Sequence, residues 1–281
     1  MKKFVLWFLA CVITITAAIY QRMTGPTYPK RSQITVNDTL CKLKLTRSLS
    51  LTEKPEVILN INDTTVKAKL FFKRYKTDEE YQVTDFIYRE KGYYATVPRQ
   101  PRAGKIQYHF EITDNSGNKS FFKESPLVIR FKGDVPSIIL IPHILFMFIA
   151  MLFSTLAGLM AIIKFPRYKM YSVWTLWLFI AGGLVLGPLV QYYAFGDLWT
   201  GIPFGWDLTD NKTLIALIFW IIAVVMNRKK ERPVYTVLAA FILLLVYSIP
   251  HSLFGSELDY STGEVTQGII LTFSAISYKN S

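Results

Sequence analysis

The chain has 281 residues, of which 51% are hydrophobic, and a formal net charge of +12 at pH 7. The hydrophobic residues gather in long uncharged runs, which excludes a single water-soluble domain, and the chain is too short for a large transporter. Many of the basic residues lie in short segments between the apolar runs, where they are expected on the cytoplasmic side of a membrane. The positive charge therefore does not indicate a nucleic-acid-binding protein.

Five apolar runs predict five membrane-spanning helices. They cover residues 4–20, 138–163, 171–195, 213–227 and 234–253. A spanning helix needs roughly 20 mostly apolar residues, so the fourth run is short. We therefore expect a membrane α-helical bundle of five spans.

The charges between these runs predict their orientation. Loops rich in Lys and Arg stay in the cytoplasm. Such residues flank the inner ends of the runs, at Lys2, Lys3, Lys164, Arg167, Lys169, Arg228, Lys229, Lys230 and Arg232. The opposite ends are acidic, with Asp197, Asp207, Asp210, Glu257, Asp259 and Glu264. We expect the N-terminus inside, residues 22–136 outside and the C-terminus outside.

These features divide the chain into an N-terminal membrane anchor (1–21), an outer domain (22–136), a four-span helical domain (137–254) and an outer C-terminal tail (255–281). The first segment also has the basic start and apolar core of a secretory signal. However, Thr16 and Ala18 make a poor cleavage signal and the apolar run is nearly long enough to span, so an uncleaved anchor is favoured over a cleaved signal.

The outer domain shows the two-residue alternation of β-strands, most clearly at residues 105–112, with a turn at residues 114–118. Seven or eight short strands predict an all-β antiparallel sandwich of immunoglobulin or fibronectin type. Cys11 lies in the first span and Cys41 in the outer domain, so they cannot form a disulfide with each other. His109 lies within a strand without a Cys or His nearby, which favours a packed or surface side chain over a metal ligand.

This outer domain is basic, with twenty-one Lys and Arg residues against thirteen Asp and Glu, or about +8. A basic surface beside a membrane can lie against anionic headgroups. It can equally bind an acidic protein partner, and the sequence leaves both interpretations open.

The five runs contain no Asp, Glu, Lys or Arg, which argues against a pump or a coupled transporter. Ser154 with Gly158 and Gly183 with Gly187 are small residues at a spacing that allows close helix packing. The loop before the fourth span, residues 195–212, is rich in apolar and aromatic residues. We expect this loop to lie on or in the membrane surface.

Polar residues at the outer ends of the spans form the candidate site. His143 and His251, each after a proline, lie at the outer leaflet on the expected topology. The short fourth span reaches membrane length if its helix begins at Leu208 with Asp207 as the N-cap, which brings Asp210, Asn211 and Lys212 into the first turn. We predict that the two histidines and this first turn converge on one polar site.

Two interpretations of this site remain. In the first, the groups are structural: they cap helix ends and fix the loop. In the second, His143 and His251 ligate haem b or a transition metal, with carboxylate help for an ion. The structural interpretation is favoured because this site has only two histidines. A hydrolase using Ser252 or Ser256 with His251 lacks a nucleophile-elbow context.

Four segments resemble an uncharacterised family of bacterial integral membrane proteins with an immunoglobulin-like periplasmic domain. They are residues 21–29, residues 130–133 leading to Pro142-His143, the loop 199–212, and Pro250-His251-Ser252 through residues 257–260. The resemblance implies a protein of the bacterial cytoplasmic membrane whose sandwich lies in the periplasm. It supplies no activity and no catalytic residue.

The sequence therefore favours a non-enzymatic membrane protein, a scaffold or subunit of an envelope complex, that contacts membrane lipids and binds an envelope protein through its sandwich and outer loops, without nucleic acid. It predicts no cofactor. The alternative is a haem- or metal-binding redox protein that uses His143 and His251.

Overall fold

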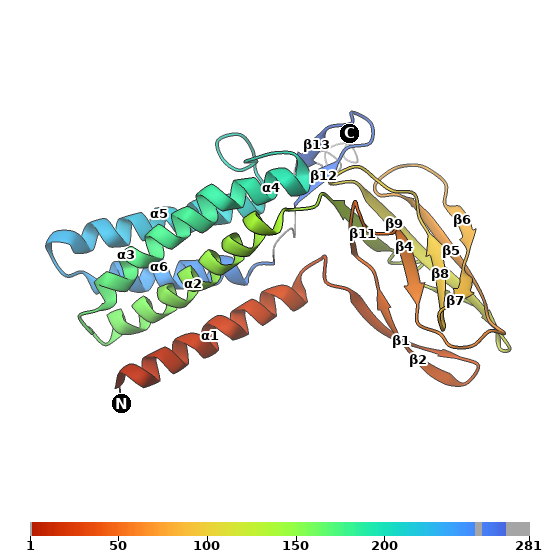
Figure 1. The fold of residues 1–281 in the computed structure, drawn as a ribbon, viewed down its shortest axis with the longest axis horizontal. Helices are drawn as coiled ribbons and strands as arrows, with labels where there is room; N and C mark the ends of the chain where they lie inside the picture. Colours follow the sequence, from red (N-terminus) through yellow and green to blue (C-terminus); the bar gives the residue numbers. More distant parts are fainter. Residues whose placement is uncertain (1, 251–254, 268–281) are drawn as a thin grey trace, which may run out of the picture. The chain divides into compact units, whose positions relative to one another are not determined.

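The computed structural model describes residues 2–250 and 255–267 (Figure 1). The chain forms two compact units. The helical unit is built from the chain up to Pro26 and from Val135 to Ser256, and the β unit from Thr27–Asp134 and Glu257–Thr266. Residues 257–266, which the sequence assigns to a tail, thus belong to the β unit.

The helical unit contains α1 (Lys2–Thr24), α2 (Ser137–Ile162), α3 (Tyr168–Phe179), the π-helix η1 (Ile180–Leu186), α4 (Gly187–Phe195), α5 (Leu208–Lys229) and α6 (Pro233–Ser248). Helices α3, η1 and α4 follow one another without a break (Figure 1). Four helices in the described part are long and apolar enough to cross a membrane: α1, α2, the continuous Tyr168–Phe195 and α5.

Helix α6 is apolar but has only 16 residues. The apolar run was expected to stay helical beyond residue 248, yet Ile249 already has an extended backbone with φ −70° and ψ 123°. Pro250 explains this end, because the ring of a proline disfavours helical backbone at the preceding residue. The sequence prediction of a helix through Ile249 and Pro250 was therefore wrong.

Small residues allow the close helix packing that the sequence predicted. A Cβ atom on Gly158 of α2 would lie 2.6 Å from the Cβ of Ala240 on α6. Ser154, one turn earlier on α2, is also buried. The two helices can therefore approach only because position 158 has no side chain.

Helix α1 is a packed member of this unit. Leu6 and Ala10 are buried in a cluster with Tyr168, and Ala17 is buried against Met151 and Tyr247. In addition, Gln21 Nε2 donates to the carbonyl oxygen of Tyr247 at 2.7 Å. One stripe of α1 therefore contributes to the core of the bundle.

The β unit contains eleven strands in residues 27–134, more than the seven or eight expected, because several have only three residues. They are β1 (Lys30–Val36), β2 (Thr39–Leu45), β3 (Ser48–Ser50), β4 (Glu56–Leu59), β5 (Lys67–Arg74), β6 (Gln82–Asp85), β7 (Ile87–Arg89), β8 (Gly92–Thr96), β9 (Lys105–Asp114), β10 (Gly117–Phe121) and β11 (Leu127–Lys132). Near the C-terminus, β12 (Ser256–Leu258) pairs with β13 (Val265–Gln267).

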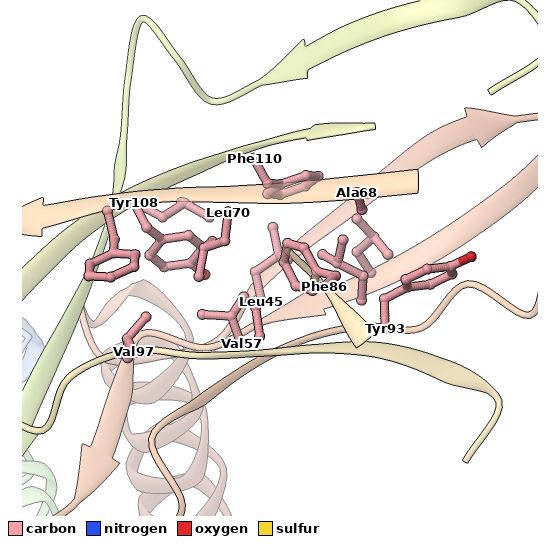
Figure 2. Packing of buried hydrophobic residues seen from close by; sticks show 14 of the residues in the cluster. Leu45, Val57, Ala68, Leu70, Phe86, Tyr93, Val97, Tyr108 and Phe110 are labelled. Atoms are coloured by element: carbon pink, nitrogen blue, oxygen red, sulfur yellow. The ribbon is translucent and has the colours of Figure 1, made fainter. Parts of the chain in front are cut away.

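The strands form a six-stranded sheet of order β3-β11-β9-β5-β6 with β10 beside β9, a three-stranded sheet β4-β8-β7, and the hairpin β1-β2. Alternate side chains of these sheets enclose one apolar core. Figure 2 shows Leu70, Tyr108 and Phe110 facing Val57 and Val97 across it. This alternation is what the period-two pattern of the sequence predicts.

The expectation of a purely antiparallel arrangement was wrong at one edge. The short strand β3 pairs with β11 in parallel, with Leu49 opposite Phe131. The other pairings given for residues 30–132 are antiparallel. A three-residue edge strand carries too little alternation to reveal its direction in the sequence.

Candidate functional site

The predicted start of the fourth long helix is confirmed. Helix α5 begins at Leu208, and Asp207 is its N-cap. One carboxylate oxygen, Oδ1, accepts hydrogen bonds from the backbone N–H of Thr209 at 2.8 Å and of Asp210 at 3.2 Å. These are two of the N–H groups that a helix start leaves without a partner, so Asp207 satisfies a local need of the helix.

Asp210 ties the loop between α4 and α5 to the first turn of α5. Its Oδ2 accepts from the backbone N–H of Thr200 at 2.6 Å, from Gln191 Nε2 at 3.1 Å and from Thr200 Oγ1 at 3.2 Å. A Cβ atom on Gly201 would lie 2.6 Å from the Cβ of Asp210. The loop can approach the helix this closely because residue 201 is a glycine.

The next two polar residues also bind backbone. Asn211 Oδ1 accepts from the N–H of Ile202 at 2.8 Å. Lys212, a buried residue, donates from Nζ to the carbonyl oxygen of Ile249 at 2.8 Å, just beyond the end of α6. Asp207, Asp210, Asn211 and Lys212 thus form one group at the start of α5, which we call the α5 cluster.

His143 lies on α2, and its Nδ1 is 2.9 Å from the carbonyl oxygen of Gly182 in η1. A carbonyl can only accept, so Nδ1 carries a proton, and in the neutral imidazole Nε2 then keeps its lone pair. His251 lies outside the described residues. Whether both histidines converge with the α5 cluster therefore stays a prediction. In the described part of the chain, no group of three or more His, Cys, Asp or Glu side chains is arranged to hold a metal ion.

The loop between α4 and α5 exposes large apolar side chains. Phe204 is 81% exposed, and Leu198, Ile202 and Trp206 are exposed as well. Trp199 Nε1 donates to the carbonyl oxygen of Ile202 at 3.1 Å, which helps to hold the loop folded. An apolar surface of this kind, between two helices that are apolar enough to cross a membrane, suits the expected position at the membrane surface.

Two further sequence predictions are confirmed. His109 is packed: only 4% of it is exposed, and its ring stacks on Phe71 with centroids 4.8 Å apart while Tyr81 meets it edge-on. Burial lowers the pKa of His109. Both Cys11 and Cys41 are free thiols.

One face of the hairpin β1-β2 is basic. Arg31 lies opposite Lys44, and Gln33 lies opposite Lys42. All four residues are exposed. The other face of the hairpin, including Ile34, is buried in the apolar core. No ion pair among the described residues involves the three cations. Because like charges opposite each other destabilise a hairpin, this face is suited to an anionic partner.

Sequence reasoning missed a second polar cluster, in which the segment Glu257–Thr266 binds to the β unit. We call Glu257–Thr266 the tail segment, and the residues Arg74, Lys76, Gln100, Ala103 and Lys105 that contact it the basic cradle. Glu257 accepts from Lys76 Nζ at 2.7 Å through one carboxylate oxygen and from Lys105 Nζ at 2.5 Å through the other. These two ion pairs join Glu257 to residues that are 181 and 152 positions earlier in the chain.

Tyr260 makes the second anchor of the tail segment. Its hydroxyl lies 3.0 Å from Gln100 Oε1 and 2.9 Å from the carbonyl oxygen of Lys105, and accepts from the N–H of Lys105 at 2.9 Å. The guanidinium of Arg74 lies over its ring, 4.9 Å from the centroid. Between the two anchors, the N–H of Leu258 donates to the carbonyl oxygen of Ala103 at 3.1 Å.

The electrostatics of the cradle follow from burial and pairing. Burial alone would raise the pKa of Glu257, but the ammonium groups of Lys105 and Lys76 outweigh it and hold that pKa below its usual value. Burial lowers the pKa of Lys105, and Glu257 offsets this only in part. The two directions are compatible because Glu257 has two cationic neighbours. Lys105 has one carboxylate neighbour, and desolvation lowers the pKa of Lys105 by more than this carboxylate raises it.

A signal for this contact was present in the sequence. The tail segment carries Glu257, Asp259 and Glu264 without a basic residue, whereas the outer domain is strongly basic. Both were expected on the same side of the membrane. Charge complementarity could therefore have suggested the contact, although it could not have chosen Lys76 and Lys105 among many cations.

Comparison with models of known protein families and with curated protein sequences finds no match for this chain.

Proposed function

We propose that this protein is a non-enzymatic scaffold of the bacterial cytoplasmic membrane. Its helical unit anchors it through five spans, and its β unit, an immunoglobulin- or fibronectin-like sandwich in the periplasm, binds a protein of the cell envelope. The resemblance to bacterial membrane proteins of the same organisation supports this proposal. Membrane lipids contact the spans and the apolar α4–α5 loop.

One observation carries the proposal. The polar groups of the α5 cluster use their described hydrogen bonds on backbone and neighbouring loop groups: Asp207 caps a helix, Asp210 and Asn211 hold a loop, and Lys212 binds a carbonyl. A catalytic site needs polar groups directed at a substrate. A cluster whose bonds fix the protein's own backbone supports a structural role instead.

The tail segment supports the five-span topology. Lys105 precedes α2 and Glu257 follows α6, yet they form an ion pair within one unit. Two groups on the same side of a membrane are separated by an even number of crossings. Helices α2, α3–α4 and α5 give an odd number, so parity favours α6 as the fourth crossing. At about 24 Å it is shorter than a hydrocarbon core of about 30 Å, which local thinning of the bilayer can accommodate.

Thiol labelling tests this topology in the full chain. We expect S261C to react with a membrane-impermeant maleimide from the periplasmic side and K229C to react only after the membrane is permeabilised. Both variants are made in a background without Cys11 and Cys41. Periplasmic labelling of K229C would contradict the proposed topology.

The basic face of the hairpin β1-β2 is the proposed contact for the partner. Cross-linking of the tagged full chain in native membranes, followed by mass spectrometry, should capture an acidic envelope protein. We expect capture to fall at least tenfold in R31E/K42E/K44E but not in K54E/K91E/K123E, which changes the net charge equally at exposed positions elsewhere. Equal capture by both variants would reject the hairpin as the contact, and capture of lipid alone would reject a protein partner.

A redox protein is a second candidate, favoured by the hydrogen bond of His143. Metal-ligating histidines characteristically donate their second ring N–H to a carbonyl or carboxylate, as Nδ1 does here to Gly182. Nε2 of His143 would then be the atom that holds a haem iron or a transition metal, and the bound group would supply the redox chemistry. Optical spectra and metal analysis of the purified full chain decide: a stoichiometric Soret band or bound metal that H143A removes would replace the scaffold proposal.

A further inference from the structure

The tail segment is held to the β unit by polar contacts. Glu257 is 4% exposed and forms two ion pairs, and Tyr260 is fixed by the backbone of Lys105 and the side chain of Gln100. Each of these partners belongs to the basic cradle. The cradle therefore presents a defined chemistry. Two ammonium groups bind a carboxylate, and the backbone of Lys105 and the side chain of Gln100 bind a phenol hydroxyl whose ring lies under a guanidinium.

By contrast, the tail segment adds nothing to the apolar core. Among the described residues, the buried core cluster of the β unit and the partly buried side chains packed on it come from residues 34–131. Burial of apolar surface is the main stabilising term of a fold. The segment can therefore leave the cradle without removing a core contact, and segments of this kind open at a lower free energy than core strands.

The internal structure of the tail segment keeps its two anchors in register. The N–H of Asp259 donates to the carbonyl oxygen of Glu264 at 2.9 Å, and Asp259 Oδ1 accepts from Ser261 N–H at 2.8 Å. Glu257 and Tyr260 stay three residues apart on a short, folded stretch. A peptide that keeps this spacing and folds in the same way can make the same contacts through its own glutamate and tyrosine.

We propose that the basic cradle is a recognition site for an acidic peptide with a glutamate three residues before a tyrosine. In the resting protein the chain's own Glu257–Tyr260 occupies it, and a partner with such a peptide binds the β unit by displacing the tail segment. This proposal rests on the proposed function, because it names the chemistry of an envelope partner.

Hydrogen exchange of the unmodified full chain in lipid nanodiscs tests the opening. The amide of Leu258, bonded to Ala103, should exchange at least a hundredfold faster than the amides of the central strands β5 and β9. Exchange of Leu258 at the same rate as those strands would show that the segment opens only with the whole unit, and would overturn the proposal. This measurement needs no substitution.

Peptide binding tests the recognition. The probe is a fluorescent peptide with the sequence of residues 255–266, which includes Ser261 and Glu264. The receptor is the full chain with E257A/Y260A, which frees the cradle. The tethered segment competes at a high effective concentration, so this variant should bind the probe at least tenfold more tightly than the wild-type chain. The peptide carrying E257Q, and the receptor carrying K105M as well, should each lose most of the binding.

The outcomes separate this proposal from the scaffold function. If E257A/Y260A keeps the sheet signal and thermal transition of the β unit but binds the probe no better than wild type, the cradle is only a fixed structural contact. Loss of the folded β unit in that variant would likewise overturn the proposal, since displacement must leave the unit intact. Probe binding without any partner captured in membranes would support the cradle and contradict the scaffold role.

Discussion

The α5 cluster and the basic cradle are both buried and polar, but they are built from different contacts. In the α5 cluster, carboxylates mostly bind backbone N–H groups within about a dozen positions, as Asp210 does with Thr200. In the cradle, Glu257 binds lysines more than 150 positions away. The first arrangement fixes the ends of neighbouring elements, whereas the second joins two distant parts of the chain.

This difference has an energetic consequence. When a buried carboxylate that accepts from backbone N–H groups is removed, these N–H groups stay buried without an acceptor. This costs free energy of folding. The charges of a buried ion pair lose hydration when the pair forms, and each of them regains it when the pair opens to water. We therefore expect the α5 cluster to be rigid and the cradle to be the part that opens.

The largest effect is expected from D210A. It removes the acceptor of the Thr200 N–H, Thr200 hydroxyl and Gln191 amide bonds, so full unfolding of the helical unit in nanodiscs should require roughly 2–4 kcal/mol less free energy. The α4–α5 loop should also become sensitive to protease. D197A is the matched control, because Asp197 is exposed in the same loop. Equal effects of both variants would show that the cluster does not hold the loop.

A smaller and local effect is expected from K105M. The Lys105 side chain is 16% exposed and that of Lys76 is 40% exposed, both in contact with Glu257. K105M should favour opening of the tail segment by about 2 kcal/mol, and K76M by less than about 1 kcal/mol, because solvent screens the more exposed pair. Exchange of the Leu258 amide measures both. A drop in the melting temperature of the core strands would instead show that the cradle is part of the global fold.

Acid should open the cradle. Because the folded-state pKa of Glu257 lies below its usual value, the carboxylate stabilises the closed state above the ordinary glutamate pKa of about 4.3. That stability is lost as pH falls through the folded-state pKa. Peptide E257Q at neutral pH mimics the protonated form. Probe binding to E257A/Y260A should therefore weaken below about pH 4, and binding unchanged at pH 3 would argue against recognition of the carboxylate.

The same distinction explains what could be predicted from sequence. The N-cap Asp207 and the packing at Gly158 were predictable because their contacts follow fixed spacings along a helix. The parallel pairing of β3 with β11 and the ion pairs of Glu257 were not, because neither follows a spacing and many cations could have served. The end of α6 was predictable only in part. Pro250 indicates that the helix ends before it, but the apolar residues beyond Ser248 favoured a longer helix.

The smallest effect on stability is expected from a substitution of Thr14 in α1. Its buried hydroxyl has no hydrogen-bond partner among the described residues, unlike Thr155 of α2, whose Oγ1 donates to the carbonyl oxygen of Met151 at 3.0 Å. Valine has nearly the same shape as threonine and no polar atom, so T14V should change the free energy of unfolding by less than about 0.5 kcal/mol, or stabilise the unit slightly. T155V is the control and should cost about 1 kcal/mol because it removes a satisfied donor. Thermal unfolding of both variants in nanodiscs measures the difference. A clear loss of stability in T14V would mean that the hydroxyl of α1 is bonded in the membrane, and that α1 is held in the bundle by a polar contact in addition to its apolar stripe.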